Sequence, residues 1–307
     1  MTTYVVPCGR SVHDGLRKQD YCPPGVVPGR FADAEKAWWP LARLRDDGEA
    51  VAAWADALET KAVASRLPGW NPRVCAEVNT LAVRGPQPPP VLLGAGHRIV
   101  LLASDTDEGM AAALTTAYIM AGGDTGLIGC ISAPADEESA LDLPERLPGG
   151  RVTVVRIPRL APRTSGLRDA VAAIGQVLRA AFDLGGPLEV HLTGGFKITL
   201  LHTLTMTEII YSRKPVRTSA WYIFDEEDGA KGPDRIDLRR FPDGYLSAMR
   251  EELSTVKLKG RVPVGGAHRG VAWKETPDGR AVLTEFGHGH LAVLGGPVLS
   301  DAGDGGP

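Results

Sequence analysis

The sequence lacks the features of a secreted or membrane protein. No apolar run approaches the roughly 18 residues that a transmembrane helix needs, and the N-terminal segment MTTYVVPCGR has no basic stretch followed by a long apolar one. Only four cysteines occur, at positions 8, 22, 75 and 130, with no CxxC pair and no zinc-ligand spacing. We therefore expect a cytoplasmic protein with reduced, buried thiols, no membrane association, no metal and no other cofactor.

An excess of positive charge is also missing. Lys and Arg number 34 against 37 for Asp and Glu, which gives a formal net charge of −3. Proteins that bind long nucleic acid usually carry a broad basic field, and this composition provides none. If the chain binds a polyanion, we expect it to do so in a local site.

The remaining composition is that of a globular protein with many loops. Apolar residues make up 43% of the 307 residues and charged residues 23%, which allows a sizeable core. Glycine (37) and proline (24) are abundant. They cluster at 86–90, 148–150, 229–233, 265–270 and 301–307, which we expect to be loops, with 301–307 as a disordered tail.

Short apolar runs predict strands that alternate with helices. The expected strands are Thr3–Cys8, Arg98–Ala103, Arg151–Ile157, Leu188–Leu192 and Ser219–Asp225, with Arg235–Leu238 as a candidate to pair beside the last. The expected helices are Glu108–Ala121, Gly166–Phe182 and Phe196–Tyr211. Such alternation predicts a mostly parallel sheet with right-handed crossovers. The fold class is therefore α/β, a Rossmann-like doubly wound domain over residues 1–240.

Two regions depart from this alternation. Residues 31–84 have apolar residues at helical spacing and predict a helical insertion after the first strand, most simply a packing or dimer element. Residues 241–300 predict a small region with a helix from Gly244 to Leu258 and a hairpin around Thr276–Gly279, similar to a winged helix. His288-Gly289-His290 would place two imidazoles on one strand face, and we expect a mobile histidine pair.

The segment Thr193-Gly194-Gly195-Phe196-Lys197 is the main candidate site. It leaves a strand and opens a helix, and in an open α/β sheet ligands bind at the carboxyl ends of the strands. Two glycines allow close approach of the backbone, the helix N-terminus offers N–H groups, and Lys197 adds a positive charge. These features predict an anion site, although a plain strand-to-helix turn with a solvated lysine fits the pattern equally well.

Two further loops are expected on the same sheet edge. Gly9-Arg10-Ser11 follows the first strand, where Ser11 is either a phosphate or ribose ligand or a helix N-cap. Ser104-Asp105-Thr106 follows the run RIVLLA, where Asp105 and Thr106 either contact a ribose or base edge or begin the next helix. His191, the nearest titratable base, is expected to be a core histidine, and Glu77 and Asn79 are candidates to cover the ligand.

Several of these segments together resemble a known family. VVPCGRS, the segment Ala76-Glu77-Val78-Asn79, RIVLLASDTDEG and above all VHLTGGFK resemble the CARF domain, the CRISPR-associated Rossmann fold, in its TGGFK branch. The resemblance covers most of residues 1–240. It implies a homodimer that binds a cyclic oligoadenylate, the ring-shaped messenger of type III CRISPR defence, across its two-fold axis. Cyclic tetra-adenylate has a compatible symmetry and is the ring we expect.

The resemblance also assigns roles by position. Ligand contacts fall to Gly9, Arg10, Asp105, Thr106, Thr193, Gly194, Gly195 and Phe196. In the family, the loop after the first strand is a serine loop, which here is Gly9-Arg10-Ser11. Arg10 departs from the small or hydroxyl residue that is more usual at its position. Lys197 and Ser11 become the catalytic pair of a ring nuclease, an enzyme that opens the messenger by metal-independent attack of a ribose 2′-hydroxyl and so ends the signal. Lys197 would stabilise phosphoryl charge, and Ser11 would orient the 2′-hydroxyl or bond the phosphate.

Three other classes of protein are alternatives to this interpretation. Arg261 and His268 have the spacing of a HEPN ribonuclease motif, but the segment VPVGGA between them cannot be a regular helix. A non-catalytic sensor whose C-terminal winged-helix-like region binds DNA or a partner is the competing interpretation. A nucleotide-binding protein outside CRISPR has less support, because GAGHR at 94–98 precedes a strand instead of following one.

Overall fold

The computed structural model describes residues 1–16, 75–84, 89–134, 139–160, 166–195, 197–223, 233–242 and 244–297. Its strands are β1 (Thr3–Pro7), β2 (Arg98–Ser104), β3 (Ile128–Ser132), β4 (Val152–Ile157), β5 (Leu188–His191), β6 (Thr218–Tyr222) and β7 (Asp234–Ile236). They form one sheet in the order β3-β4-β2-β1-β5-β6-β7, in which β7 pairs antiparallel with β6 and the other pairs are parallel. The predicted α/β class with a mostly parallel sheet is confirmed, and so is the pairing of the Arg235 segment beside β6.

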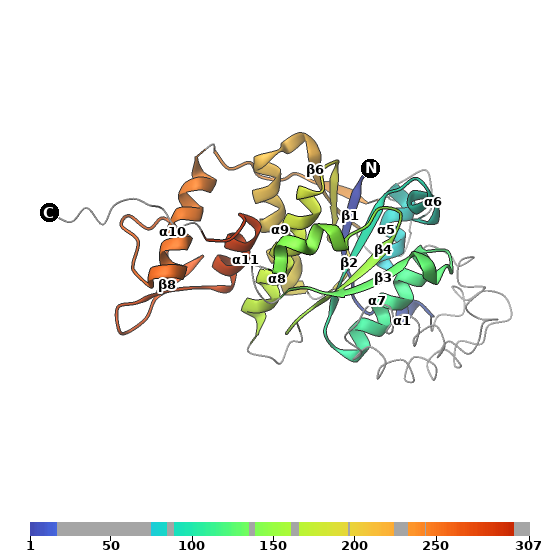
Figure 1. Ribbon diagram of the computed structural model, residues 1–307, viewed down its shortest axis with the longest axis horizontal. Helices are drawn as coiled ribbons and strands as arrows, with labels where there is room; N and C mark the ends of the chain where they lie inside the picture. The colour runs from blue at the N-terminus through green and yellow to red at the C-terminus, as the bar shows by residue number, and fades with distance from the viewer. Residues whose placement is uncertain are drawn as a thin grey trace.

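Helices cover both faces of this sheet (Figure 1). One face carries α1 (Ser11–Leu16), α5 (Ala76–Arg84), α6 (Pro89–Gly94) and α7 (Asp107–Met120), and the other carries α8 (Leu167–Asp183) and α9 (Lys197–Arg213). Short 3-10 turns lie at Thr125–Leu127, Ser139–Arg146 and Pro215–Arg217.

The central strands are buried on both sides because their apolar residues are continuous. Ile99 and Leu101 pack in the core under α7, whereas Val100 and Leu102 pack in the core under α8, as the two-residue period of a strand requires. The run RIVLLA therefore has the doubly buried character expected from its sequence.

Several elements were not predicted. β3 contains Gly129 and Cys130, which dilute its β-branched pattern, and it forms by pairing with β4 from Ile128↔Val152 onward. α6 begins with Pro89-Pro90, which we interpreted as a loop, although proline is well tolerated in the first turn of a helix. The 3-10 segment Ser139–Arg146 lies in a stretch for which the sequence predicted no element. Of the expected insertion at 31–84, only α5 lies within the described residues, and the tail 301–307 lies outside them.

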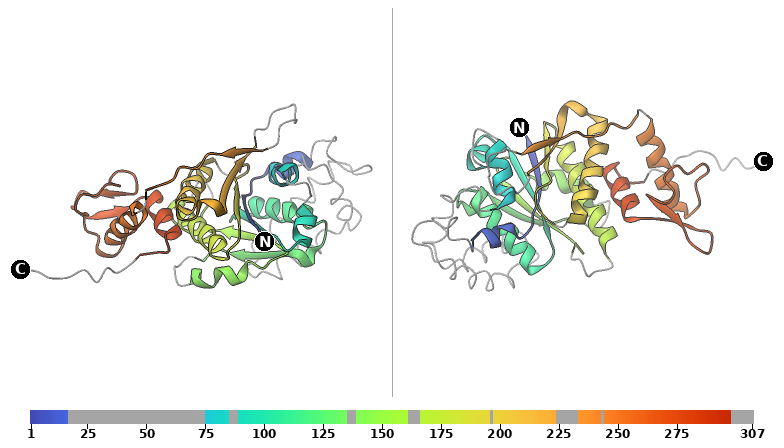
Figure 2. Two further views of the ribbon diagram at one scale, coloured as in Figure 1. Left: turned by 90° about the horizontal axis from the view of Figure 1, so that it is seen from above. Right: turned by 180° about the vertical axis from the view of Figure 1, so that it is seen from behind.

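The C-terminal residues form a module on the outer side of α8 and α9. It comprises α10 (Tyr245–Lys259), β8 (Trp273–Glu275), β9 (Ala281–Leu283) and α11 (Glu285–Val293). Figure 2 shows α8 and α9 between this module and the sheet. Leu253 and Trp273 of the module belong to the same buried core as α8, so apolar packing is continuous from the sheet to the module. The predicted hairpin is confirmed: Thr276 N–H donates to the Arg280 carbonyl at 2.8 Å.

The segment between Arg261 and His268 contains no helix, as its composition predicted. His268 is buried, with Nδ1 2.7 Å from Glu252 Oε2 and Nε2 2.8 Å from the Tyr245 hydroxyl. Trp273 Nε1 donates to the same glutamate. These bonds join α10 to the loop before β8 and give His268 a structural role inside the module.

The expectation for His288 and His290 was wrong. Both belong to α11, which Thr284 caps by accepting a hydrogen bond from Gly287 N at 3.3 Å, and His290 is buried. Glycines within this helix permit close packing of helices. A methyl group at Gly289 would lie 2.5 Å from Val171 Cγ1, and one at Gly175 would lie 2.7 Å from the Gly289 carbonyl oxygen.

This contact predicts a loss of stability in Gly289→Ala. The added methyl overlaps Val171 and must push α11 from α8, which should cost about 2 kcal/mol of the free energy of unfolding despite the better helix propensity of alanine. Chemical denaturation measures the change. Gly94→Ala is the matched control, because a methyl group there meets nothing within 4 Å and should cause no loss. Equal stabilities of the two variants would contradict the packing argument.

His290 predicts a dependence of stability on pH. Burial, and then the charges of His202 and His268, lower the pKa of His290 to about 4, whereas an unfolded histidine titrates near about 6.5. The folded state disfavours the protonated ring, so its contribution is complete above about pH 6.5 and is lost as the pH falls toward about 4, on the order of 3 kcal/mol. In urea unfolding across this window, His290→Gln should lose less stability than the wild type. If the variant and the wild type lose equal stability as the pH falls, the pH dependence does not come from His290.

Candidate functional site

The main candidate loops meet at the point where the strand order reverses. β1 and β5 are parallel neighbours, with Thr3 opposite Leu188 and Val5 opposite Val190. From β1 the chain builds one half of the sheet through β2, and from β5 it builds the other half through β6. Ligands of open α/β sheets bind at this position, in the crevice outside the carboxyl ends. The expectation that the serine loop and the TGG loop (Thr193-Gly194-Gly195) share one edge of the sheet is confirmed.

Glycines bring the two loops into direct backbone contact. A Cβ on Gly9 would lie 2.8 Å from the Gly195 nitrogen. Gly195 has a φ of +88°, a conformation that side chains with a Cβ rarely adopt. A Cβ on Gly194 would overlap Glu77 Oε1 and lie 2.7 Å from the Pro7 carbonyl oxygen. Each of the three glycines is therefore required where it stands.

Glu77 of α5 occupies the space between these loops. Its side chain is fully buried, and it accepts hydrogen bonds from Gly9 N at 2.8 Å and from Ser11 Oγ at 2.6 Å. The same carboxylate touches the position of a Cβ on Gly194. A negative charge thus lies where an anion would be expected to contact the serine loop. The sequence analysis named Glu77 only as a candidate cover, and no spacing in the sequence indicated that its carboxylate reaches both loops.

Ser11 and Arg10 are both engaged within the protein. Ser11 Oγ donates to Glu77 and accepts from Ala76 N at 3.3 Å, so it ties the start of α1 to the start of α5. Arg10 forms an ion pair with Glu108 of α7, with Nη1 2.8 Å from Oε1. Arg10, the residue just before α1, therefore contacts α7.

The TGGFK segment offers two groups toward a ligand. The Lys197 side chain is exposed at the first residue of α9, and it has no ion-pair partner within the part of the chain that the structure describes. Thr193 Oγ1 is buried and has no hydrogen-bond partner among the described residues. Buried hydroxyls are usually satisfied, so an unsatisfied one beside the TGG backbone needs an explanation. Phe196 lies outside the described residues.

Asp105 and Thr106 lie one strand further along the edge, after β2. Thr106 is the N-cap of α7, accepting from Gly109 N at 3.1 Å, and its hydroxyl lies 2.9 Å from Ser104 Oγ. The capping role that we considered for Asp105 belongs to Thr106. Asp105 is exposed and accepts from Arg159 N at 2.7 Å, so it faces the loop after β4 and not the TGG loop.

Buried titratable groups line the underside of the site. His191 is fully buried, with Nδ1 3.0 Å from Thr80 Oγ1, which confirms the expected core histidine. Cys8, Cys75 and Cys130 are free and buried, whereas Cys22 lies outside the described residues. Burial, and then the negative charge of Glu77, raise the pKa values of the Cys8 and Cys75 thiols well above their usual range. These thiols are therefore structural. The charge of Glu77 affects thiols on both sides of it, Cys8 before the serine loop and Cys75 before α5.

Comparison with protein-family models and with curated proteins finds no match to this sequence. No helix in the described ranges is both long and apolar enough to cross a membrane. In those same ranges, no three His, Cys, Asp or Glu side chains gather as a metal-binding group would. The molecule is thus characterised by its class, an α/β protein with a mostly parallel, Rossmann-like sheet, and by a glycine-rich candidate site at its switch point.

Proposed function

We propose that the chain binds a cyclic oligoadenylate, with cyclic tetra-adenylate as the preferred ring, at the switch point between β1 and β5 as a homodimer. The observation that carries the proposal is the junction of the serine loop with the TGG loop, where backbone glycines, a buried unsatisfied Thr193 hydroxyl and an exposed Lys197 lie together. Backbone N–H groups at a helix start and a nearby lysine suit a phosphodiester. The resemblance to the CARF domain agrees with this placement.

We further propose that the bound ring is cleaved without a metal. A ribose 2′-oxygen forms a bond to the adjacent phosphorus, and the bond from this phosphorus to the 5′-oxygen breaks. The 2′-hydroxyl releases its proton to solvent, and the 5′-oxygen takes up a proton from solvent. The products are linear and end in a 2′,3′-cyclic phosphate. Lys197, with the N–H groups of Gly194 and Gly195, would stabilise the charge on the phosphoryl oxygens.

The experiment is an incubation of the protein with cyclic tri-, tetra- and hexa-adenylate in EDTA, with products separated by liquid chromatography and identified by mass. Conversion to linear di-adenylate with a 2′,3′-cyclic phosphate supports the ring nuclease and names its substrate. Binding of an intact ring supports a sensor. Failure to bind any ring contradicts the proposal as a whole.

The non-catalytic sensor is favoured by one specific observation. The Ser11 hydroxyl already donates a hydrogen bond to Glu77. Of the two proposed catalytic side chains, only Lys197 is therefore available to contact a ligand. α9 begins at Lys197 and packs further along against α11, where the His202 and Phe286 rings lie 4.4 Å apart. A ligand that shifts the start of α9 would therefore act directly on the C-terminal module. In this alternative, that winged-helix-like module binds DNA or a partner.

A further inference from the structure

A second concave site lies between α8 and the C-terminal module, and it does not depend on the proposed function. It is a groove of about 1020 Å³, close to the upper end of the range of small-molecule sites. Its walls come from the loop after β4, the first half of α8, the end of α10, the hairpin strand β9 and α11. No part of the TGG loop or of the serine loop lines it.

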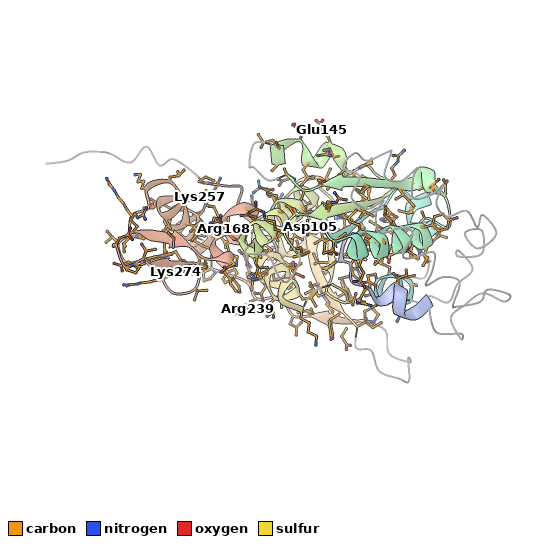
Figure 3. The ribbon with its side chains drawn as sticks, turned by 90° about the horizontal axis from the view of Figure 1, so that it is seen from below. Asp105, Glu145, Arg168, Arg239, Lys257 and Lys274 are labelled. Atoms are coloured by element: carbon orange, nitrogen blue, oxygen red, sulfur yellow. The ribbon has the colours of Figure 1, made fainter. Side chains whose placement is uncertain are left out.

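Cationic side chains converge on this groove from separate elements. Arg159, Arg168, Lys257 and Arg280 line it, and Asp169 is the one carboxylate among its described lining residues. Figure 3 labels Arg168 and Lys257 close together where α8 meets the module. Arg159 and Arg168 share Asp169, at 2.7 and 3.3 Å, and Lys257 has no acidic partner within the described ranges. Arg280 pairs with Asp278 at 2.7 Å, so the excess of positive charge in the groove comes from Lys257 and from the two arginines that share one carboxylate.

Arg159 is held over the start of α8 in an unusual conformation. Its φ is +56°, the single positive value among the described residues other than glycine. The conformation is fixed by the bond from Arg159 N to Asp105 and by the ion pair with Asp169. Such backbone strain persists where the surroundings over-determine it, commonly at ligand sites. Here it places a guanidinium beside the free N–H groups of a helix of 17 residues.

The floor of the groove is apolar. Ala172 and Ala173 of α8 line it together with Leu283, Leu291 and Ala292 of the module. His288 lies in the same wall, and burial, then the positive charges of Lys257 and Arg168, lower its pKa to about 4, against smaller opposing effects of Asp169 and Glu285. His288 is consequently neutral near neutral pH and presents a flat ring rather than a charge. A cationic rim above an apolar floor matches a ligand that has both phosphate groups and an aromatic ring.

From this arrangement we infer that the groove is a binding site for a nucleoside phosphate, with the phosphates on Arg159, Arg168 and Lys257 and the base on the apolar floor. A phosphate would replace Asp169 as the partner of the two arginines, and a planar guanidinium can bind it through two bonds. The ligand would bridge α8 and the module, so it would also strengthen their association.

The test is calorimetric titration in EDTA with ATP, with pyrophosphate for the phosphate part alone and with adenosine for the ring part alone. We expect ATP to bind at least tenfold more tightly than pyrophosphate, and adenosine to bind more weakly than either. Arg168→Ala and Lys257→Ala should each weaken ATP binding by about tenfold. Lys259→Ala and Lys274→Ala are matched controls that remove exposed lysines of the module from outside the groove and should bind ATP as the wild type does.

Three results would overturn the inference. They are the absence of ATP binding at millimolar concentration, equal affinity for ATP and pyrophosphate, and equal losses in the Lys257 and Lys259 variants. Lys197→Ala separates this site from the switch point: loss of ATP binding in that variant alone would place the nucleotide on the TGG loop instead. Retained ATP binding together with a failure to bind any cyclic oligoadenylate would leave the groove established and the proposed function rejected.

Discussion

Replacing Lys197 with alanine should slow ring cleavage by roughly 10²- to 10³-fold, the loss typical of removing one preorganised group that stabilises transition-state charge. Lys197 is exposed at the first residue of α9, beside the TGG backbone. Its ammonium can approach a phosphoryl oxygen without breaking an existing ion pair among the described residues. Single-turnover measurement of linear product, with enzyme in excess over cyclic tetra-adenylate, isolates the chemical step from binding and release.

The control for Lys197→Ala is Lys214→Ala, which removes an exposed lysine just beyond the other end of the same helix. That variant should cleave at the wild-type rate. Lys197→Arg should recover part of the rate, because it keeps the charge but changes the geometry of its donors. Equal rates for the Lys197 and Lys214 alanine variants would remove Lys197 from the catalytic machinery and favour the sensor.

The sequence predicted the sheet because its central strands have continuous apolar runs. RIVLLA and RVTVVRI are buried on both faces, and such runs are easily distinguished from amphipathic helices. β3 was missed because Gly129 and Cys130 contribute little β-propensity and its strand character comes from pairing with β4. α11 was missed for a related reason. Its glycines at 287 and 289 suggest a loop in isolation, and their role is visible only beside Ala272 and Val171.

The candidate site was predictable in position but not in its electrostatics. The TGG and serine loops were placed on one edge from the rule for parallel strands, and they lie there. The contact of Glu77 with both loops depends on how α5 packs on the sheet, which a separation of 66 residues from Ser11 does not reveal. The same is true of the groove: Arg159, Lys257 and Arg280 are brought together only by the packing of the module on α8.

Glu77 should oppose ligand binding, and Glu77→Gln should bind the ring on the order of 100-fold more tightly. Its carboxylate accepts bonds from Gly9 N and Ser11 Oγ and abuts Gly194, where a phosphate would lie. Two like charges about 5 Å apart repel by roughly 3 kcal/mol at an effective dielectric constant near 20. Glutamine keeps the shape of the side chain and removes this charge, which also leaves the Ser11 hydrogen free for a ligand.

Equilibrium binding of a 2′-deoxy cyclic tetra-adenylate measures this effect without cleavage, since the ring has no attacking hydroxyl. Glu251→Gln, an exposed glutamate on α10, is the matched control and should leave the affinity unchanged. If Glu77 instead positions the serine loop for the ligand, Glu77→Gln and Ser11→Ala should both bind the ring more weakly. Weaker binding in both variants would make the Glu77–Ser11 bond part of the binding site. Tighter binding in Glu77→Gln would show that the carboxylate must be displaced or neutralised when the ring binds.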